Sequence, residues 1–339
     1  MKNLIYIVIL AWLSLALSFD LSTSNELAPD KSVSEILNAL GDPNPTHYRA
    51  NIDPQQVEMG RQLVYNGRTK MPDGSMSNYI SKFYVCTDCH NQVQEDPILT
   101  ESDPEKRLQY INEKGLKFLQ ATTFWGMVNR EFWYNDDYVL KYGSLVEAAH
   151  KSLEESTQLC ARECSSGRYL EAWELEAIIQ YYWTLELKIK DLNLSSSEYS
   201  SLETALKSGN QNPTLIKMLK SKYALKSPAT FVSEPENRGE GFSDLVGNAE
   251  NGELIWENSC KTCHREYGPS QLLLDNSRFT FNKFKRNFKK DSNFNLYTII
   301  RHGTYAEPGH RQYMPLYPEE RMSNQQIEDI RAFIERELQ

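Results

Sequence analysis

This chain of 339 residues has few long apolar runs, few cysteines and few histidines, and it lacks an excess of positive charge. After Leu17 no run is long or apolar enough to cross a bilayer. Lys and Arg number 37 against 46 Asp and Glu, and the net charge of −9 argues against nucleic acid as a partner. Cysteine and histidine each occur six times, so an ordered cluster of them is informative.

The length predicts about two domains, and an apolar content of 40% is enough for packed cores. The N-terminus has the pattern of a secretory signal. Met1-Lys2-Asn3 gives a positive start, and the apolar run from Leu4 to Leu17 is short for a membrane span. Ala16-Leu17-Ser18 predicts cleavage after Ser18, hence a signal peptide at residues 1–18 and a periplasmic protein. The alternative is an uncleaved signal, and only then is the protein attached to the membrane.

Four of the six cysteines lie in two copies of one motif. Residues 86–90 read Cys-Thr-Asp-Cys-His, and residues 260–264 read Cys-Lys-Thr-Cys-His. Both follow C-x-x-C-H, the attachment signature of c-type haem. At this composition one chance match is expected about 0.002 times. The sequence therefore predicts two haem c groups with iron, attached at Cys86, Cys89, Cys260 and Cys263, with His90 and His264 as iron ligands.

Two other interpretations of the motifs are weaker. A zinc half-site would need further Cys and His clusters at matching spacing. A thioredoxin-like redox pair would need a strand followed by a helix around it. Neither pattern is present in the sequence. Haem c is also attached outside the cytoplasm, which agrees with the predicted signal peptide.

Apolar spacing predicts a mostly helical chain. Tyr79–Val85 is the exception and reads as a strand. The closing helix is expected to begin with a capping box of Ser323 and Gln326. The expected helices are Val33–Leu40, one starting at Pro54, Leu108–Leu119, Leu145–Leu159, Leu170–Leu187, Asn251–Trp256, Tyr297–Arg301 and Ser323–Leu338.

Each half of the chain has the same order: a helix, a haem motif, loops and helices, a ligand loop and a closing helix. This order resembles the class I cytochrome c fold used twice in tandem, which implies an all-α protein with loop or hairpin insertions in the first copy. The predicted divisions are a lead-in at 19–50, domain 1 at 51–190, a linker at 191–240 that holds two short helices, and domain 2 at 241–339.

The second haem has a candidate for its other axial ligand. Tyr313-Met314-Pro315 precedes the closing helix and resembles the Met-Pro ligand loop of class I cytochromes. A thioether stabilises ferrous iron and raises the potential, so Met314 is the predicted ligand. Met322 and His302 are the alternatives, and Met314 would then be a core residue.

The first half has no Met-Pro in the matching place. Measured back from its closing helix, the position of Met314 corresponds to Arg162, which cannot ligate iron, but Cys160 and Cys164 flank it. A thiolate is an anionic ligand that stabilises ferric iron. Cys160 is the predicted ligand. Other possibilities are Cys164, Met127, His150, an open position, or a Cys160–Cys164 disulfide, which would be strained on a regular helix.

The segment Ser152–Cys160, followed by Ser165-Ser166-Gly167-Arg168, resembles the haem-ligating cysteine segment of dihaem thiosulfate dehydrogenases. A similar segment occurs in the haem subunit of the sulfur-oxidising complex. The resemblance implies that Cys160 is the ligand and Gly167-Arg168 the turn after it. Two features depart from the family: this chain has two cysteines here rather than one, and Ser156 stands at the position of the family's arginine.

A basic segment stands out in this acidic chain. It reads either as an amphipathic stretch with a solvated face or as a docking face for an acidic electron partner or an anionic substrate. Its cations are Lys283, Lys285, Arg286, Lys289 and Lys290, interleaved with Phe279, Phe281, Phe284 and Phe288.

Single-electron transfer is the function that the motifs predict, with another cytochrome or a terminal oxidase as redox partner. The alternative is an oxidoreductase of the thiosulfate dehydrogenase type. In that case the Cys-ligated haem is the active site for a small sulfur anion, and the other haem is the electron exit. A dihaem peroxidase is a third possibility, but it needs an open or displaceable iron position, and both haems have a candidate ligand.

Overall fold

The computed structural model describes residues 27–270, 272–288, 290, 294–304 and 314–339, and the predicted signal peptide lies outside them. The described part is helical, as predicted, and its only extended pairings are isolated bridges such as that between Lys70 and Met76. None of its helices is long and apolar enough to span a bilayer.

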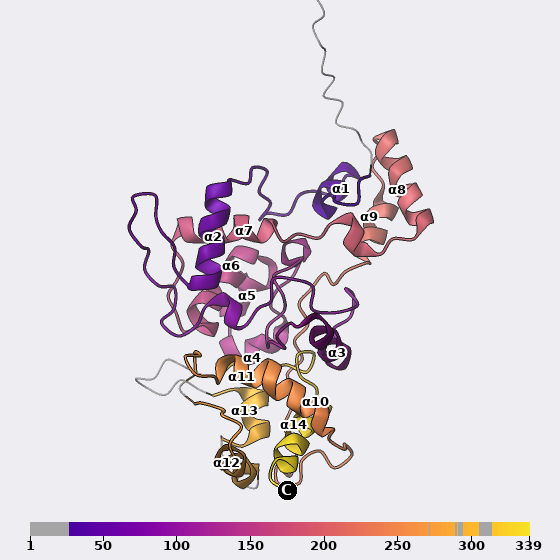
Figure 1. The fold of residues 1–339 in the computed structure, drawn as a ribbon. Helices are drawn as coiled ribbons and strands as arrows, with labels where there is room; N and C mark the ends of the chain where they lie inside the picture. Colours follow the sequence, from indigo (N-terminus) through magenta and orange to yellow (C-terminus); the bar gives the residue numbers. More distant parts are fainter. Residues whose placement is uncertain (1–26, 271, 289, 291–293, 305–313) are drawn as a thin grey trace, which may run out of the picture.

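Figure 1 shows two helical regions joined through α3. The α-helices are α1 (Val33–Ala39), α2 (Pro54–Asn66), α3 (Pro104–Lys114), α4 (Val139–Tyr142), α5 (Leu145–Lys151), α6 (Leu153–Leu159), α7 (Ala172–Trp183), α8 (Ser196–Ser208), α9 (Pro213–Lys220), α10 (Ala249–Ile255), α11 (Lys261–Cys263), α12 (Arg278–Phe288), α13 (Leu296–His302) and α14 (Asn324–Arg336). Shorter turns are η1 (Cys86–Asp88), η2 (Met127–Asn129), η3 (Asp136–Tyr138), η4 (Cys160–Cys164), η5 (Ile189–Leu192) and η6 (Trp256–Cys260).

The predicted strand at Tyr79–Val85 is wrong. The Ile80 N–H donates to the Gly67 carbonyl at 2.9 Å, and the Ile80 carbonyl accepts from the Arg168 N–H at 3.0 Å. Loops on both sides therefore satisfy this backbone, and no partner strand among the described residues pairs with it. Tyr79–Val85 therefore forms a loop that leads into the first C-x-x-C-H motif, although its apolar pattern is typical of a strand.

Two helix boundaries also differ from expectation, while one cap is confirmed. The single helix expected at Leu145–Leu159 is divided, because Ser152 is extended and its hydroxyl accepts from the Glu155 N–H, which starts α6. Helix α3 begins earlier than predicted, at Pro104, and ends at Gly115 in the left-handed region. Ser323 and Gln326 form the predicted capping box of α14.

Two helix pairs repeat the same close crossing. In the first, α2 crosses α7, and a Cβ added at Gly60 would lie 2.0 Å from the Ala177 carbonyl oxygen. In the second, α10 crosses α14, and a Cβ at Gly252 would lie 1.9 Å from the Asp329 carbonyl oxygen. Only glycine allows backbones to approach this closely within a helix.

Each region has a core of its own, but one segment of the first half is buried in the C-terminal core. Leu108, Ile111 and Phe118 come from the insertion after the first haem motif, yet they are buried in the core of the C-terminal region. The Phe118 N–H also donates to the Asn258 carbonyl at 2.8 Å. The insertion therefore joins the first haem motif to the second region. The C-terminal core around it contains Ile255, Trp256, Phe281, Tyr297, Ile327, Ile330 and Phe333.

A third core cluster joins α1 to α8 and α9, so the lead-in and residues 191–240 pack together (Figure 1). Its fully buried members include Val33 and Leu40 from α1 or its end, Leu202 from α8 and Leu219 from α9. The Asn212 N–H donates to the Leu40 carbonyl at 2.9 Å. The two short helices expected within residues 191–240 are therefore α8 and α9, and they pack on α1 beside the first region.

The crossing glycines give a testable prediction. Gly60→Ala and Gly252→Ala should each lower the free energy of unfolding by about 3 kcal/mol, because the methyl group must push two helix backbones apart. Chemical denaturation of the oxidised protein measures the change. Gly115→Ala is the control, because its φ is +62° and an added Cβ meets no atom within 4 Å. Backbone strain alone should then lower the free energy of unfolding by about 1 kcal/mol. Equal losses at Gly60 and Gly115 would contradict the close crossing.

Candidate haem sites

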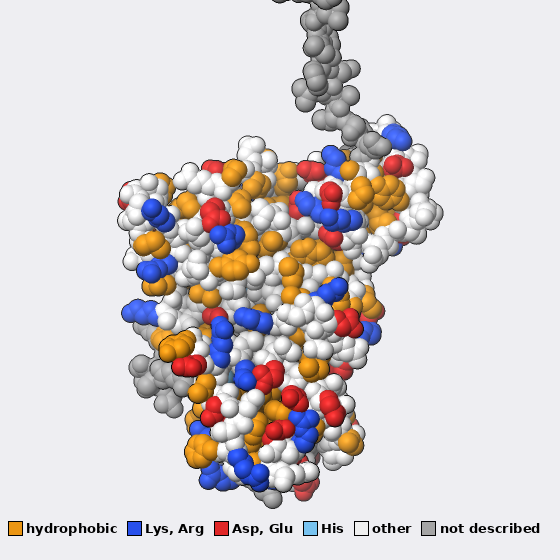
Figure 2. Space-filling view, viewed as in Figure 1, with side chains coloured by type: hydrophobic (Ala, Val, Ile, Leu, Met, Phe, Trp, Pro, Cys, Tyr) orange, Lys and Arg blue, Asp and Glu red, His pale blue; other side chains and the backbone are white. Residues whose placement is uncertain are grey.

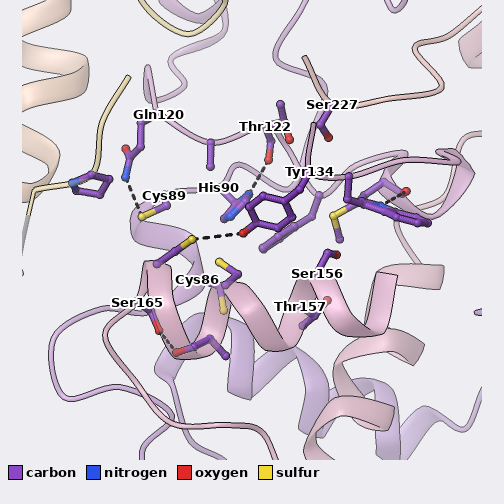
Figure 3. A pocket seen from close by; sticks show the side chains of 18 of the residues that line it. Cys86, Cys89, His90, Gln120, Thr122, Tyr134, Ser156, Thr157, Ser165 and Ser227 are labelled. Carbon is purple, nitrogen blue, oxygen red and sulfur yellow. Dashed lines mark hydrogen bonds between the residues drawn. The ribbon is translucent and has the colours of Figure 1, made fainter. Parts of the chain in front are cut away.

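The first C-x-x-C-H motif lines a cavity of about 170 Å³. Cys86, Cys89 and His90 reach it from η1 and the residue pair that follows, and Cys160 and Cys164 reach it from η4. In Figure 3 the helix that bears Ser156 and Thr157 lies across the pocket from His90 and Thr122. The fold thus brings the first motif together with both candidate cysteine ligands, which follow it by 70 residues or more in the sequence.

The cavity fits a large, flat and mostly apolar group. A water molecule needs ~10–15 Å³ by the same measure, so the space exceeds a single water site by an order of magnitude. Apolar and aromatic side chains dominate its wall: Leu63, Ile80, Tyr84, Val85, Phe124, Met127, Trp133, Tyr134, Tyr138, Leu170, Ile178 and Tyr182.

His90 is oriented for ligation by two contacts. Its Nδ1 lies 2.6 Å from the Thr122 carbonyl oxygen, so Nδ1 carries the hydrogen and Nε2 keeps its lone pair (Figure 3). Its ring stacks on Phe124, with centroids 4.2 Å apart. Burial lowers the pKa of His90 to about 4, so the imidazole is neutral at physiological pH. A neutral imidazole with one free nitrogen is the form that binds iron.

The two motif cysteines are protonated thiols in this environment. Burial raises the pKa of Cys86 to about 12 and raises that of Cys89 well above its usual value. The Gln120 Nε2 donates to the Cys89 sulfur at 2.8 Å, which holds that side chain at the cavity wall. These positions suit thioether attachment along one edge of a porphyrin.

Cys160 and Cys164 lie on a π-helical turn, not on the regular helix assumed from sequence. Such turns occur often at functional sites. The hydroxyls of Tyr134 and Tyr142 each lie 3.3 Å from the Cys164 sulfur. A hydrogen bond from Cys160, followed by those from the tyrosines, lowers the pKa of Cys164 to about 6 although burial opposes it. The same contact raises the pKa of Cys160, so Cys160 stays the protonated donor and the negative charge of the pair lies on Cys164.

The other ligand candidates in the first half are placed differently. Met127 lines the cavity. His150 contacts the Tyr134 carbonyl through Nδ1 and packs against the Phe132 ring, with centroids 5.0 Å apart. Ser156 lines the cavity and donates to the Leu153 carbonyl.

The second motif begins where α10 continues into η6 and α11. His264 Nδ1 lies 2.9 Å from the Leu272 carbonyl oxygen, which leaves its Nε2 free as in His90. Met314 is partly buried against the C-terminal core, and its N–H donates to the Thr304 hydroxyl at 2.7 Å. Residues 305–313, which include Tyr313 of the ligand loop, lie outside the described residues.

The alternative ligands of the second half have other partners. Met322 is 1% exposed within the C-terminal core, and its carbonyl accepts from Arg301 at 2.8 Å. His302 lies at the end of α13, with its Nε2 3.9 Å from a Glu234 carboxylate oxygen.

The C-terminal region also contributes to the first cavity. Pro315, Leu316, Pro318 and Arg321 line it, directly after the predicted ligand Met314. Local sequence patterns could not reveal Arg321 as part of this site. The aromatic cluster around Tyr134 and Tyr138 was visible in the sequence, but its contact with Cys164 was not.

Residues 249–336 match the cytochrome c family. The C-terminal region contains a cytochrome c domain. The match includes Cys260, Cys263, His264 and Met314, so this domain carries covalently bound haem c, whose iron supports electron transfer. No curated protein and no solved structure matches the chain.

The cysteine pair gives a prediction for the first site. Cys160→Ala should remove the thiolate-type low-spin signal from the low-temperature electron paramagnetic resonance spectrum of the ferric protein. Cys164→Ala should keep a shifted signal, because it removes only a neighbour of the ligand. If the two variants behave the opposite way, Cys164 is the ligand. If the signal survives in both variants, either cysteine can supply the thiolate. If the wild-type protein shows no such signal, the ligand is another residue of the cavity wall such as Met127.

Proposed function

We propose that this protein is an exported dihaem cytochrome c that carries single electrons between two covalently bound haems and a redox partner protein. The observation that best supports this proposal is the composition of the first cavity. It collects a complete C-x-x-C-H motif, a histidine oriented for ligation and two cysteines in one apolar space. The cytochrome c domain at 249–336 supports the second haem.

The repeated helix crossing supports a tandem arrangement. The pairs α2/α7 and α10/α14 each enclose one motif, and each uses a glycine at its closest approach. Both motif histidines direct Nδ1 at a backbone carbonyl. Domain 1 would thus occupy residues 51–190 and domain 2 residues 241–339, with the predicted loop or hairpin insertions in domain 1.

The chain offers different sulfur ligands to its two sites. His90 and Cys160 would hold the first iron, and His264 and Met314 the second. Haem c supplies one-electron chemistry when bound, and a thiolate favours the ferric form whereas a thioether favours the ferrous form. Two sites of unequal potential suit an electron carrier, and the insertion after the first motif packs into the C-terminal core and so connects them. Attachment of haem c outside the cytoplasm and the signal at residues 1–18 support a periplasmic location.

Helix α12 supports docking to an acidic redox partner. Lys283, Lys285 and Arg286 are exposed, while Phe281 and Phe288 anchor the helix in the C-terminal core. Phe279 is 75% exposed beside these cations. Basic and apolar side chains gather in Figure 2 at the lower end of the molecule, where Figure 1 places α12. A positive face on a protein with a net charge of −9 favours one orientation of an acidic partner.

One observation favours the second candidate, oxidation of a small sulfur anion at the first haem. Lys141, Tyr134 and Tyr142 line the cavity beside Cys164 and place one cation and two hydroxyls at its wall. Ser156 in place of the family's arginine removes one anion ligand, so electron transfer remains the preferred function.

Haem content and turnover test the proposal. The purified protein should carry two haems per chain by mass and by its Soret band, and Cys86→Ala/Cys89→Ala should carry one. Thiosulfate, tetrathionate and peroxide should each give no turnover with an artificial electron acceptor or donor. Turnover of a sulfur anion would establish the second candidate instead. A wild-type protein with one haem would refute the dihaem proposal.

Charge reversal on α12 tests the docking face. Lys283→Glu/Lys285→Glu should slow oxidation of the reduced protein by ferricyanide about tenfold at low salt, because a nearby positive field attracts this anion. A cationic cobalt(III) complex should not react more slowly. The control is Lys207→Glu/Lys217→Glu on α8 and α9, which changes the net charge equally at exposed positions. Equal effects of the two pairs, measured by stopped flow, would contradict a specific face.

A further inference from the structure

One peptide group connects His90 to a buried carboxylate. The carbonyl of Thr122 accepts from His90 Nδ1 at 2.6 Å. The N–H of Thr123 belongs to the same peptide group and donates to Glu95 Oε1 at 2.8 Å. His90, this peptide and Glu95 therefore form a continuous chain of hydrogen bonds on the side of His90 away from its free Nε2.

Glu95 is held as an anion in the interior. The residue is 1% exposed, its Oε2 accepts from Asn91 Nδ2 at 2.8 Å, and its Oε1 pairs with Arg321 Nη1 at 2.8 Å. Burial alone would raise the pKa of Glu95. The positive charges of Arg321 and Arg107, the ion pair with Arg321 and the hydrogen bond from Asn91 outweigh burial, so its pKa lies below the usual value.

We propose that Glu95 is a positioning residue that increases the electron donation of His90 to the first haem iron through the Thr122–Thr123 peptide group. A negative charge at the N–H end of an amide shifts electron density to its carbonyl oxygen. A more negative oxygen pulls harder on the His90 Nδ1 hydrogen and makes Nε2 a stronger base. The ferric state is then favoured, as it is by a thiolate on the other face.

Among the described residues the second motif histidine has a more exposed partner, which serves as an internal comparison. His264 Nδ1 contacts the Leu272 carbonyl at the longer distance of 2.9 Å. The peptide that carries this carbonyl joins Leu272 to Leu273, whose side chains are 42% and 47% exposed. Solvent near this peptide screens charge, so the relay would separate the potentials of the two haems.

Arg321 makes the relay depend on the neighbouring domain. It lies in the C-terminal region, is 1% exposed and donates to the carbonyls of Leu119 and Ala121 at 2.8 Å. Those carbonyls belong to the segment that ends at Thr122 and Thr123. Docking of the second domain therefore positions the peptide group that His90 contacts.

The inference rests on the proposed haem at the first site, and Glu95→Gln tests it. Glutamine keeps an oxygen for the Thr123 N–H but removes the charge. Redox-poised electron paramagnetic resonance at pH 8 follows the thiolate-type signal of the first haem. At a fixed potential the ferrous-to-ferric ratio of this haem should rise about tenfold, equal to 59 mV for one electron. The ratio of the second haem should not change.

Two matched variants separate the relay from other effects. Asp96→Asn removes a neighbouring buried carboxylate whose pKa burial raises to about 6, so Asp96 is charged at pH 8. It should change the ratio less than Glu95→Gln does, because the hydrogen bond to Thr123 comes from Glu95. Glu174→Gln removes a fully buried carboxylate paired with Arg168 at 2.6 Å and should leave both ratios unchanged.

A spectroscopic measurement on His90 itself completes the test. The nitrogen-15 resonance of His90 Nδ1 should shift in Glu95→Gln and stay in place in Asp96→Asn. If Glu95→Gln does not fold, Glu95→Asp carries the test, since its shorter side chain withdraws from Thr123 and should give a smaller rise of the same sign.

The outcomes distinguish the two proposals. Two haems per chain with an unchanged first-haem ratio in a folded Glu95 variant would overturn the relay alone. An equal rise in Asp96→Asn would also overturn it, because charge without the hydrogen bond would then suffice. A wild-type protein without haem at Cys86 and Cys89 would overturn both proposals.

Discussion

The buried ion pair of Arg321 and Glu95 is the interaction on which the two halves depend. Both side chains are at most 1% exposed, so their charges must be compensated inside the protein. The Leu119 and Ala121 carbonyls and the Asn91 amide supply that compensation. A pair that is buried on both sides of an interface allows little relative motion, since separation would leave two uncompensated charges. The interface is thus specified by polar contacts as well as by apolar packing.

The insertion after the first motif connects the ion pair to the cores. It leaves the first haem motif, contributes α3 to the C-terminal core and returns to Thr122 beside His90. Arg107 on α3 donates to the Leu119 and Arg321 carbonyls and lies over the Phe118 ring. This insertion therefore contributes to the C-terminal core, to the contact between the two regions and to the hydrogen bond with His90. A change in one of these contacts would affect the other two.

Much of the candidate site was predictable from local sequence. The two C-x-x-C-H motifs need residue types at short spacing, and such patterns do not depend on the fold around them. Helix starts were also predictable where a cap is local, as at Ser323 and Gln326. The predictions of a strand at Tyr79–Val85 and of a single helix at Leu145–Leu159 were wrong because both relied on apolar periodicity alone. Backbone partners distant in sequence hold Tyr79–Val85 as a loop, and one extended residue, Ser152, divides the helix.

The sequence alone determined which residue types could hold haem: four cysteines and two histidines stand in C-x-x-C-H motifs, and each half has further sulfur side chains. Only the tertiary structure decided which groups surround them. The first cavity takes wall residues from both regions, and Glu95 reaches His90 through a peptide more than 25 residues further along the chain. Hydrogen bonds and burial of this kind cannot be predicted from the spacing of residues in the sequence, because they form where segments distant in the sequence meet.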